Sequence, residues 1–135
     1  ARITRLRTGF AGATDNAEER NMAKGLLVAG LDFTQVDPDE FNDWYDNVHI
    51  PELLRVPGML SATRYALQEA AIYHVEGGAM PEHKYMCVYE MEGDVDEIMA
   101  KIRRSVANGQ VHMSDSLDLP SSRLSFWTRG KTLTA

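Results

Sequence analysis

A histidine and several aromatic residues fall at helical spacing in the segment 41–65. His49 follows Tyr45 by four residues and Phe41 by eight, so that the three side chains share one stripe of a helix. If this stripe packs on a sheet, the imidazole is partly removed from water and its pKa lies near working pH. Such a histidine can take a proton from an activated carbon and return it elsewhere. His49 is therefore the candidate general base or acid.

Each of these residues also has a structural interpretation. His49 would then bond a backbone carbonyl that is freed where Pro51 ends the helix. Tyr45 is the second candidate catalytic residue, because its hydroxyl can orient His49 or polarise a substrate carbonyl. The alternative is a core residue whose ring is buried and whose hydroxyl reaches water. Phe41 and Trp44 are candidate substrate-binding residues, and their alternative is packing in the core or, for Trp44, at a dimer interface.

Two further candidate substrate-binding residues lie together on a strand expected after the helix. Arg64 falls on an apolar strand face, where a guanidinium needs a partner. The functional partner is a substrate carboxylate or enolate, and the structural alternative is a salt bridge to Asp43, Asp46 or Glu90. Tyr65 falls on the opposite face and is either a pocket wall or part of a sheet interface.

No cofactor or metal site is indicated by the sequence. The four histidines are scattered, without the spacing that presents two metal ligands on one face of an element. The glycines form neither a phosphate loop nor a dinucleotide fingerprint. Haem bound by His49 or another histidine is left open, although no feature specifically supports it. The single cysteine, Cys87, excludes an internal disulfide framework and is expected to be a small buried residue in a strand.

Composition limits the class of protein. The length of 135 residues indicates one domain, and we expect a polar arm at 1–22 followed by a folded domain at 23–135. The net charge of −6 argues against unspecific binding to nucleic acid or to anionic membranes. No apolar run approaches the roughly 20 residues that span a bilayer. Neither is a signal peptide indicated, so cytoplasmic residence is expected.

The first helix has a well-marked start. Asp37 is expected to cap it, and Glu40 completes a capping-box pattern. The helix should run to about His49, because Pro51 disfavours helical geometry at the residue before it. A short turn over 52–55 is then expected.

The remaining elements follow from alternating and helical patterns of apolar residues. A second helix is expected to open at Gly93-Asp94 and to close at Asn108-Gly109. The long connection at 68–83 forms an extended hairpin or a lid. Strands are expected at 23–33, 59–67, 84–91 and 123–128, with Leu60, Ala62, Arg64 and Ala66 on one face of the second. The order βαββαβ is that of a ferredoxin-like α+β fold with a four-stranded antiparallel sheet.

The strands at 23–33 and 84–91 carry apolar residues on both faces. Two helices cover only one face of a four-stranded sheet, so something must cover the other. A second copy of the same sheet is the simplest candidate, and we therefore expect a symmetric homodimer with its sheets packed face to face.

A set of residues on the expected first helix, the turn after it and the second and third strands forms a recognisable motif: Phe41, Trp44-Tyr45, His49, Pro51, Pro57-Gly58, Arg64-Tyr65 and Tyr89-Glu90. The set resembles the EthD-like branch of the dimeric α+β barrel superfamily, and the element order extends the match from about 23 to 129. The resemblance implies a dimeric α+β barrel with a pocket between helices and sheet in each subunit. The members of this superfamily include muconolactone-type isomerases, polyketide cyclases, cofactor-free monooxygenases, dehydratases, haem proteins and proteins without known activity.

Residues and resemblance together favour a cofactor-free enzyme of a degradative or biosynthetic pathway. It would act on a small aromatic, lactone or polyketide-like metabolite by proton transfer, as an isomerase, cyclase or lyase. His49 would be the acid or base, Tyr45 the orienting hydroxyl and Arg64 an anion clamp. The alternatives are a cofactor-independent monooxygenase acting on an electron-rich phenol, and a non-catalytic accessory protein that binds a small molecule.

Overall fold

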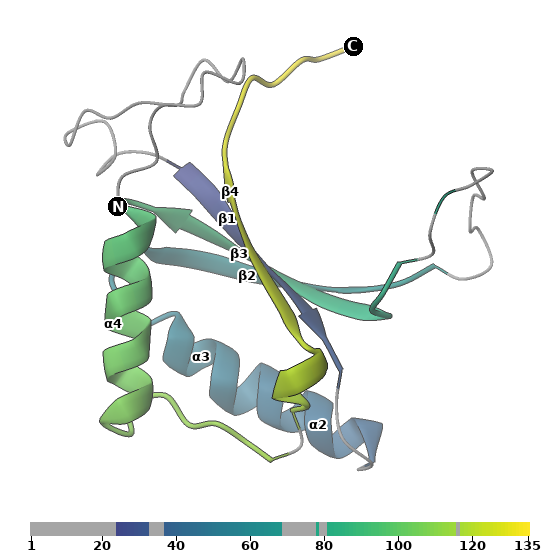
Figure 1. The fold of residues 1–135 in the computed structure, drawn as a ribbon, viewed down its shortest axis with the longest axis vertical. Coiled ribbons are helices and arrows are strands. Elements are labelled where there is room, and N and C mark those ends of the chain that lie inside the picture. The colour runs from purple at the N-terminus through teal and green to yellow at the C-terminus, as the bar shows by residue number, and fades with distance from the viewer. Residues whose placement is uncertain (1–23, 33–36, 69–77, 79–80, 116) are drawn as a thin grey trace.

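Four strands form one antiparallel sheet in the order β2-β3-β1-β4 (Figure 1). The computed structural model describes residues 24–32, 37–68, 78, 81–115 and 117–135. The expected arm at 1–22 and most of the expected long connection, residues 69–77 and 79–80, lie outside this part. The strands are β1 (Lys24–Leu31), β2 (Met59–Ala66), β3 (Tyr85–Glu92) and β4 (Arg123–Thr128).

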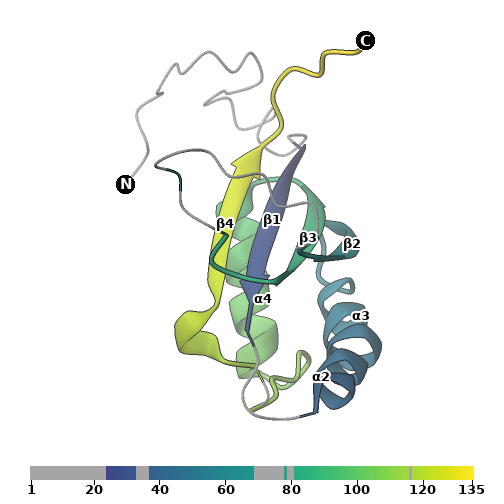
Figure 2. The same cartoon turned by 90° about the vertical axis from the view of Figure 1, so that its right-hand side faces the viewer.

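The helices lie together on one face of this sheet (Figure 2). They are α2 (Pro38–Trp44), the π-turn η1 (Tyr45–His49), α3 (Ile50–Leu53) and α4 (Val95–Ala107). A short 3-10 turn, η3 (Leu119–Ser121), precedes β4. The element order and the strand order confirm the ferredoxin-like βαββαβ prediction.

The Asp37 cap of the first helix is as predicted, but the end of this helix is not. Asp37 caps α2 by accepting a hydrogen bond of 3.0 Å from the backbone N–H of Asp39. The expected break before Pro51, with a turn over 52–55, is wrong, because the chain continues through η1 into α3. Pro51 follows the π-turn η1 directly as the second residue of α3, and its missing N–H leaves one backbone bond of the continuing helix unformed.

The predicted face pattern of β2 is wrong at its first residues. A β-bulge between Met59 and Ser61 inserts one extra residue opposite β3. Leu60 is therefore turned to the outer face of the sheet, where it is 51% exposed, and does not share the face of Ala62 and Arg64. The sequence alternates regularly here, but a bulge shifts alternation by one residue.

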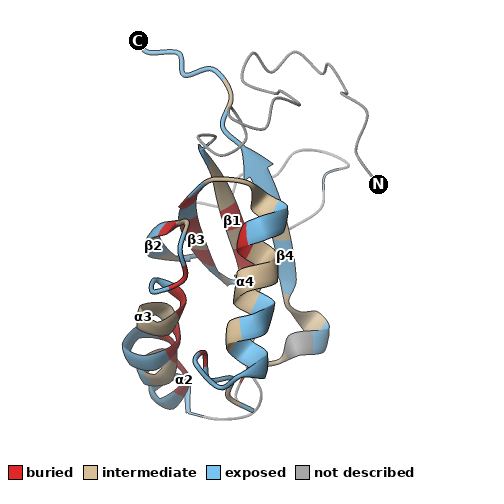
Figure 3. Ribbon diagram, turned by 90° about the vertical axis from the view of Figure 1, so that its left-hand side faces the viewer, coloured by how far each residue is buried: buried red, intermediate tan, exposed pale blue. Residues whose placement is uncertain are grey.

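The core lies between the helices and the inner face of the sheet (Figure 3). On β3 the predicted alternation is present, with Cys87, Tyr89 and Met91 buried on the inner face. The turn at Pro57-Gly58 is present as well. It requires glycine, because the φ of Gly58 is +102° and a Cβ there would lie 2.7 Å from the side chain of Ile98 on α4.

The outer face of the sheet carries large apolar side chains that are exposed in a single chain. No helix among the described residues covers this face (Figure 2). The exposed fractions are 51% for Leu60, 49% for Tyr65, 38% for Met86 and 59% for Trp127. Isolated exposed apolar residues are common, but a group on one flat face indicates an interaction surface.

Candidate functional site

A cavity of about 250 Å³ lies between the helices and the inner face of the sheet. Tyr45 and His49 enter its lining from η1, and Tyr89 enters from β3. The other lining residues are mostly apolar: Leu27, Ala29, Leu31, Leu53, Met99, Ile102, Val106, Met113, Leu117, Ser122 and Leu124. An apolar cavity with a few convergent polar groups is typical of a site for a small organic molecule.

His49 is buried in the described core beside the hydroxyls of Tyr45 and Tyr89, with an exposed fraction of 7%. Its Nδ1 lies 3.3 Å from the backbone carbonyl oxygen of His112. A carbonyl can only accept a hydrogen bond, so Nδ1 carries the proton in this contact and Nε2 is left as the acceptor. The imidazole therefore bonds a carbonyl distant in sequence and not one freed near Pro51.

The surroundings of His49 keep the imidazole neutral and fix its plane. Burial lowers the pKa of His49 below its ordinary value of 6.5, and the opposing effects are the bond to the His112 carbonyl and the charge of Glu52. The Trp44 ring stacks on the imidazole, with centroids 4.8 Å apart and an interplanar angle of 27°. A neutral, oriented imidazole is suited to accept a proton.

Tyr45 contacts His49 through its ring, while its hydroxyl points to another residue. The ring centroids of Tyr45 and His49 are 5.0 Å apart. The hydroxyls of Tyr45 and Tyr89 lie 2.6 Å from each other. Burial raises the pKa of both phenols, so both stay protonated near neutral pH. One of the two O–H groups is used in the bond between them, and the other can donate to a nearby acceptor.

Arg64 lies beside this site but outside the cavity lining. Its Nη1 forms an ion pair of 2.6 Å with Asp46, and its Nη2 donates to the side-chain oxygen of Asn42 at 2.9 Å. The guanidinium carbon lies 4.7 Å from the centre of the Tyr45 ring. This geometry is that of the structural alternative, in which Arg64 ties β2 to the first helix and stacks on the aromatic cluster.

The other candidate binding residues also lie outside the lining. Phe41 is fully buried in the core, with its ring centroid 5.6 Å from that of Tyr45. Trp44 packs partly buried against the core and reaches the site through its stack on His49. Tyr65 faces away from the helices and lines a separate hollow on the outer face of the sheet. The structure thus brings Phe41, Trp44, Tyr45 and His49 together and leaves Tyr65 apart.

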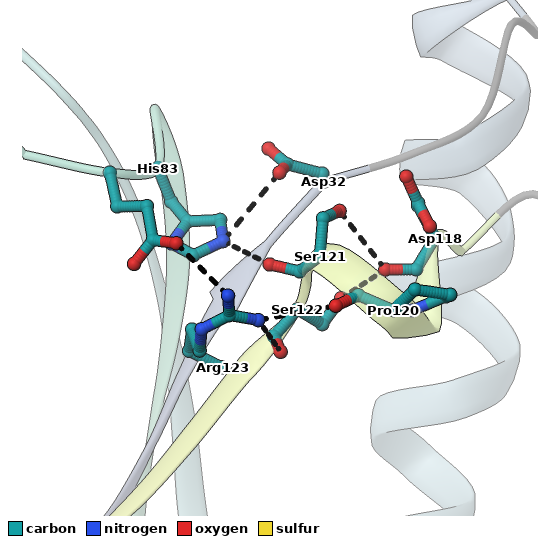
Figure 4. Close-up of polar contacts among 8 residues, drawn as sticks. Asp32, His83, Asp118, Pro120, Ser121, Ser122 and Arg123 are labelled. Atoms are coloured by element: carbon teal, nitrogen blue, oxygen red, sulfur yellow. Dashed lines mark hydrogen bonds and ion pairs between the residues drawn. The ribbon is translucent and has the colours of Figure 1, made fainter.

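The cavity contains polar groups that the sequence did not single out as site residues. Tyr89 could have been found, because it shares the inner face of β3 with the buried Cys87 and Met91. Ser122 had no comparable signal, since it follows a segment without regular periodicity. Its hydroxyl donates to the Asp118 carbonyl at 2.7 Å (Figure 4).

A polar cluster holds the segment around Ser122 against the end of β1. His83 donates through Nε2 to the Ser121 carbonyl at 2.6 Å and lies 3.5 Å from the Asp32 carboxylate (Figure 4). The backbone N–H of Asp118 donates to the Asp32 carbonyl at 3.0 Å. These contacts fix the part of the cavity wall that precedes β4.

The residues described in the structure contain no group of three or more His, Cys, Asp or Glu side chains that could hold a metal ion. Across that same part of the chain, none of the helices is both long and apolar enough to cross a membrane.

No known family model and no curated protein sequence matches this chain. Among solved structures, it is similar to a "putative monooxygenase" from Shewanella loihica PV-4, with 15% identity over 82% of this chain and 98% of that chain and a TM-score of 0.50. The shared feature is the fold. A structure of an EthD family protein from Bacillus halodurans C-125 is 18% identical over 82% of this chain and 99% of that chain, with a TM-score of 0.41. At such identities, activity has to be argued from the site.

Proposed function

We propose that the protein is a cofactor-free enzyme that moves a proton on a small, largely apolar aromatic or polyketide-like compound bound in the cavity. The observation that carries this proposal is the buried His49, which lines an apolar cavity with its Nδ1 bonded and its Nε2 left to accept a proton. Isomerisation, cyclisation and elimination all begin with this step. The resemblance of the motif around His49 to EthD-like proteins supports the same kind of site.

His49 and the Tyr45–Tyr89 pair have different roles in the proposed proton transfer. His49 Nε2 takes a proton from a carbon next to a carbonyl, and the electrons of the C–H bond move into the enolate. A phenol O–H of the Tyr45–Tyr89 pair donates to the enolate oxygen and stabilises its charge. Return of the proton to another carbon completes an isomerisation and restores the neutral imidazole. General acid–base catalysis of this kind contributes about 10²–10⁴-fold in rate.

The lining favours an uncharged substrate. No Arg, Lys, Asp or Glu is among the described residues that line the cavity. A carboxylate that entered it would lose its hydration without gaining a cationic partner, because Arg64 is paired with Asp46. The proposal therefore leaves Arg64 out of substrate binding and favours ketones, phenols and neutral lactones over acids.

A deuterium-exchange assay in D₂O tests His49 whatever the product of the complete reaction is. Neutral aromatic ketones and phenols are incubated with the protein, and incorporation of deuterium at the acidic carbon is followed by NMR. We expect exchange with the wild type and a rate at least tenfold lower with His49→Gln. Val48→Ala, at an exposed position of the same π-turn, is the control and should keep the wild-type rate. Equal rates for His49→Gln and wild type would remove His49 from the mechanism.

A monooxygenase is the second candidate, and it shares the first step. A carbanion or phenolate formed in an apolar cavity can react with O₂, and the similar Shewanella protein is described as a "putative monooxygenase". Oxygen uptake in proportion to product indicates this reaction, and deuterium exchange without oxygen uptake indicates an isomerase, cyclase or lyase. Binding of a compound with neither exchange nor oxygen uptake, unaffected by His49→Gln, indicates a non-catalytic binding protein.

We also propose that two copies associate through the outer faces of their sheets. The exposed group of Leu60, Tyr65, Met86 and Trp127 supports this proposal, because a second sheet would remove it from water. Sedimentation should show a dimer for the wild type and a monomer for Trp127→Lys, which places a charge on this face.

A further inference from the structure

Glu52 holds one residue of a distant loop by two hydrogen bonds. Its Oε1 accepts from the backbone N–H of His112 at 2.7 Å, and its Oε2 accepts from Nδ1 of the same residue at 2.6 Å. These bonds lower the pKa of the Glu52 carboxyl, so the group is charged near neutral pH. The side chain of Glu52 is only 13% exposed, although that of His112 is 66% exposed. We call this arrangement the Glu52–His112 clamp.

The clamp acts on the one carbonyl that bonds the imidazole of His49. His112 is held at its N–H and at its side chain, and its carbonyl accepts from His49 Nδ1 at 3.3 Å. The segment at 110–115 forms no helix or strand, so regular structure does not fix the direction of this carbonyl. The preceding residue, Val111, is anchored to α4 by a bond of 2.9 Å to the Ser105 carbonyl. Beyond that anchor, Glu52 holds the backbone N–H and the imidazole of His112, the residue that carries this carbonyl.

We propose that Glu52 and His112 are positioning residues that keep His49 in the Nδ1–H tautomer, so that Nε2 is the nitrogen that takes the proton. This inference rests on the proposed role of His49 as the base. The protonated nitrogen of a neutral imidazole is set by the hydrogen bond that the ring makes. If the carbonyl turns away, Nδ1–H loses its acceptor, the ring reverts towards the Nε2–H tautomer that dominates in water, and the nitrogen needed as base is blocked.

If the clamp had a structural role alone, it would connect the loop to α3 without controlling the tautomer of His49. Loss of the clamp would then lower the stability of the fold and leave the tautomer of His49 as it was. The two roles are therefore separated by a measurement on the imidazole itself. Long-range ¹H–¹⁵N correlation spectra of protein labelled at histidine distinguish the two neutral tautomers by the shifts of their nitrogens.

The test compares Glu52→Gln and Glu52→Ala with Glu97→Gln, which removes the same charge from an exposed position of α4. We expect the Nδ1–H tautomer of His49 in the wild type and in Glu97→Gln. Glu52→Ala should show a large Nε2–H fraction and an exchange rate lower by about tenfold, comparable to the loss of groups that orient metal-binding histidines. Glu52→Gln should lie between, because its amide oxygen still accepts one of the two bonds.

Two results would overturn the inference: an Nε2–H tautomer of His49 in the wild type, or an unchanged tautomer in Glu52→Ala. If Glu52→Ala does not fold, the tautomer of His49 is measured in His112→Ala, which loses one of the two bonds but keeps the backbone carbonyl. A shift towards Nε2–H in this variant supports the inference, and an unchanged tautomer overturns it. The outcome is distinct from that of the proposed function. If no compound undergoes exchange that depends on His49, the proposed function fails, while a tautomer shift in Glu52→Ala still supports the positioning role.

Discussion

The hydroxyl pair of Tyr45 and Tyr89 gives a quantitative test of the site geometry. The two side chains are 2% and 1% exposed, and their oxygens are 2.6 Å apart. Tyr45→Phe removes one partner and leaves the Tyr89 hydroxyl buried without it, and Tyr89→Phe does the reverse. Each change should cost about 1–3 kcal/mol of unfolding free energy, the penalty for a buried polar group that loses its bond.

The double variant should cost much less than the sum of the two. With both hydroxyls removed, no buried group is left without a partner, and replacement of both partners by apolar groups is nearly neutral. We therefore expect a coupling energy of about 2 kcal/mol, the sum of two single losses at the lower end of their range.

Guanidinium denaturation of the four proteins measures this cycle. Protein concentration is held constant, because association of the folded state shifts apparent stability. Tyr65→Phe, at a position that is 49% exposed, is the control and should change the unfolding free energy by less than about 0.5 kcal/mol. If the losses of the two single variants simply add, the hydroxyls do not act as a pair, and the donor proposed for the enolate oxygen is wrong.

Two further predictions concern charge. Because burial lowers the pKa of His49 below 6.5, the unfolded chain binds that proton more tightly, so stability should fall as the pH drops from about 6.5 through the lowered value. Denaturation midpoints measured against pH should show this slope, and His49→Gln should lack it; the same slope in both proteins would contradict the neutral buried imidazole. Arg64→Leu should keep the affinity for a neutral cavity ligand within about twofold, and should cost about 1 kcal/mol of stability or less, since its partner Asp46 is half exposed. A tenfold loss of affinity in calorimetry would return Arg64 to substrate binding.

The fold could be predicted because its elements are marked by local chemistry. Asp37 and the Pro57-Gly58 turn mark the ends of segments through backbone geometry, which depends on a few neighbouring residues. The alternation on β3 reports which side chains face the core. The bulge that turns Leu60 outward has no such marker, since it depends on how two distant strands pair.

The site could be predicted only in part, because its contacts connect residues far apart in sequence. Helical spacing places Tyr45 and His49 on one stripe, and the structure shows both in the cavity lining. The partner of each comes from elsewhere: Tyr89 from β3, and the His112 carbonyl from a loop. Spacing rules describe neighbours within an element and carry no information on such pairs.

The π-turn explains how the first helix brings the proposed base, His49, and Glu52 to the same residue, His112. In η1 the backbone N–H of Ile50 bonds the Tyr45 carbonyl, five residues back, so one residue more than in an α-helix is included in the turn. The α-helical pattern resumes at Ile50, and Pro51 follows directly after the π-turn. The chain therefore continues for another helical turn, and Glu52 follows His49 closely enough for both to contact His112. If the helix had ended before Pro51, as sequence rules favour, the clamp on the imidazole would have no carboxylate at this place.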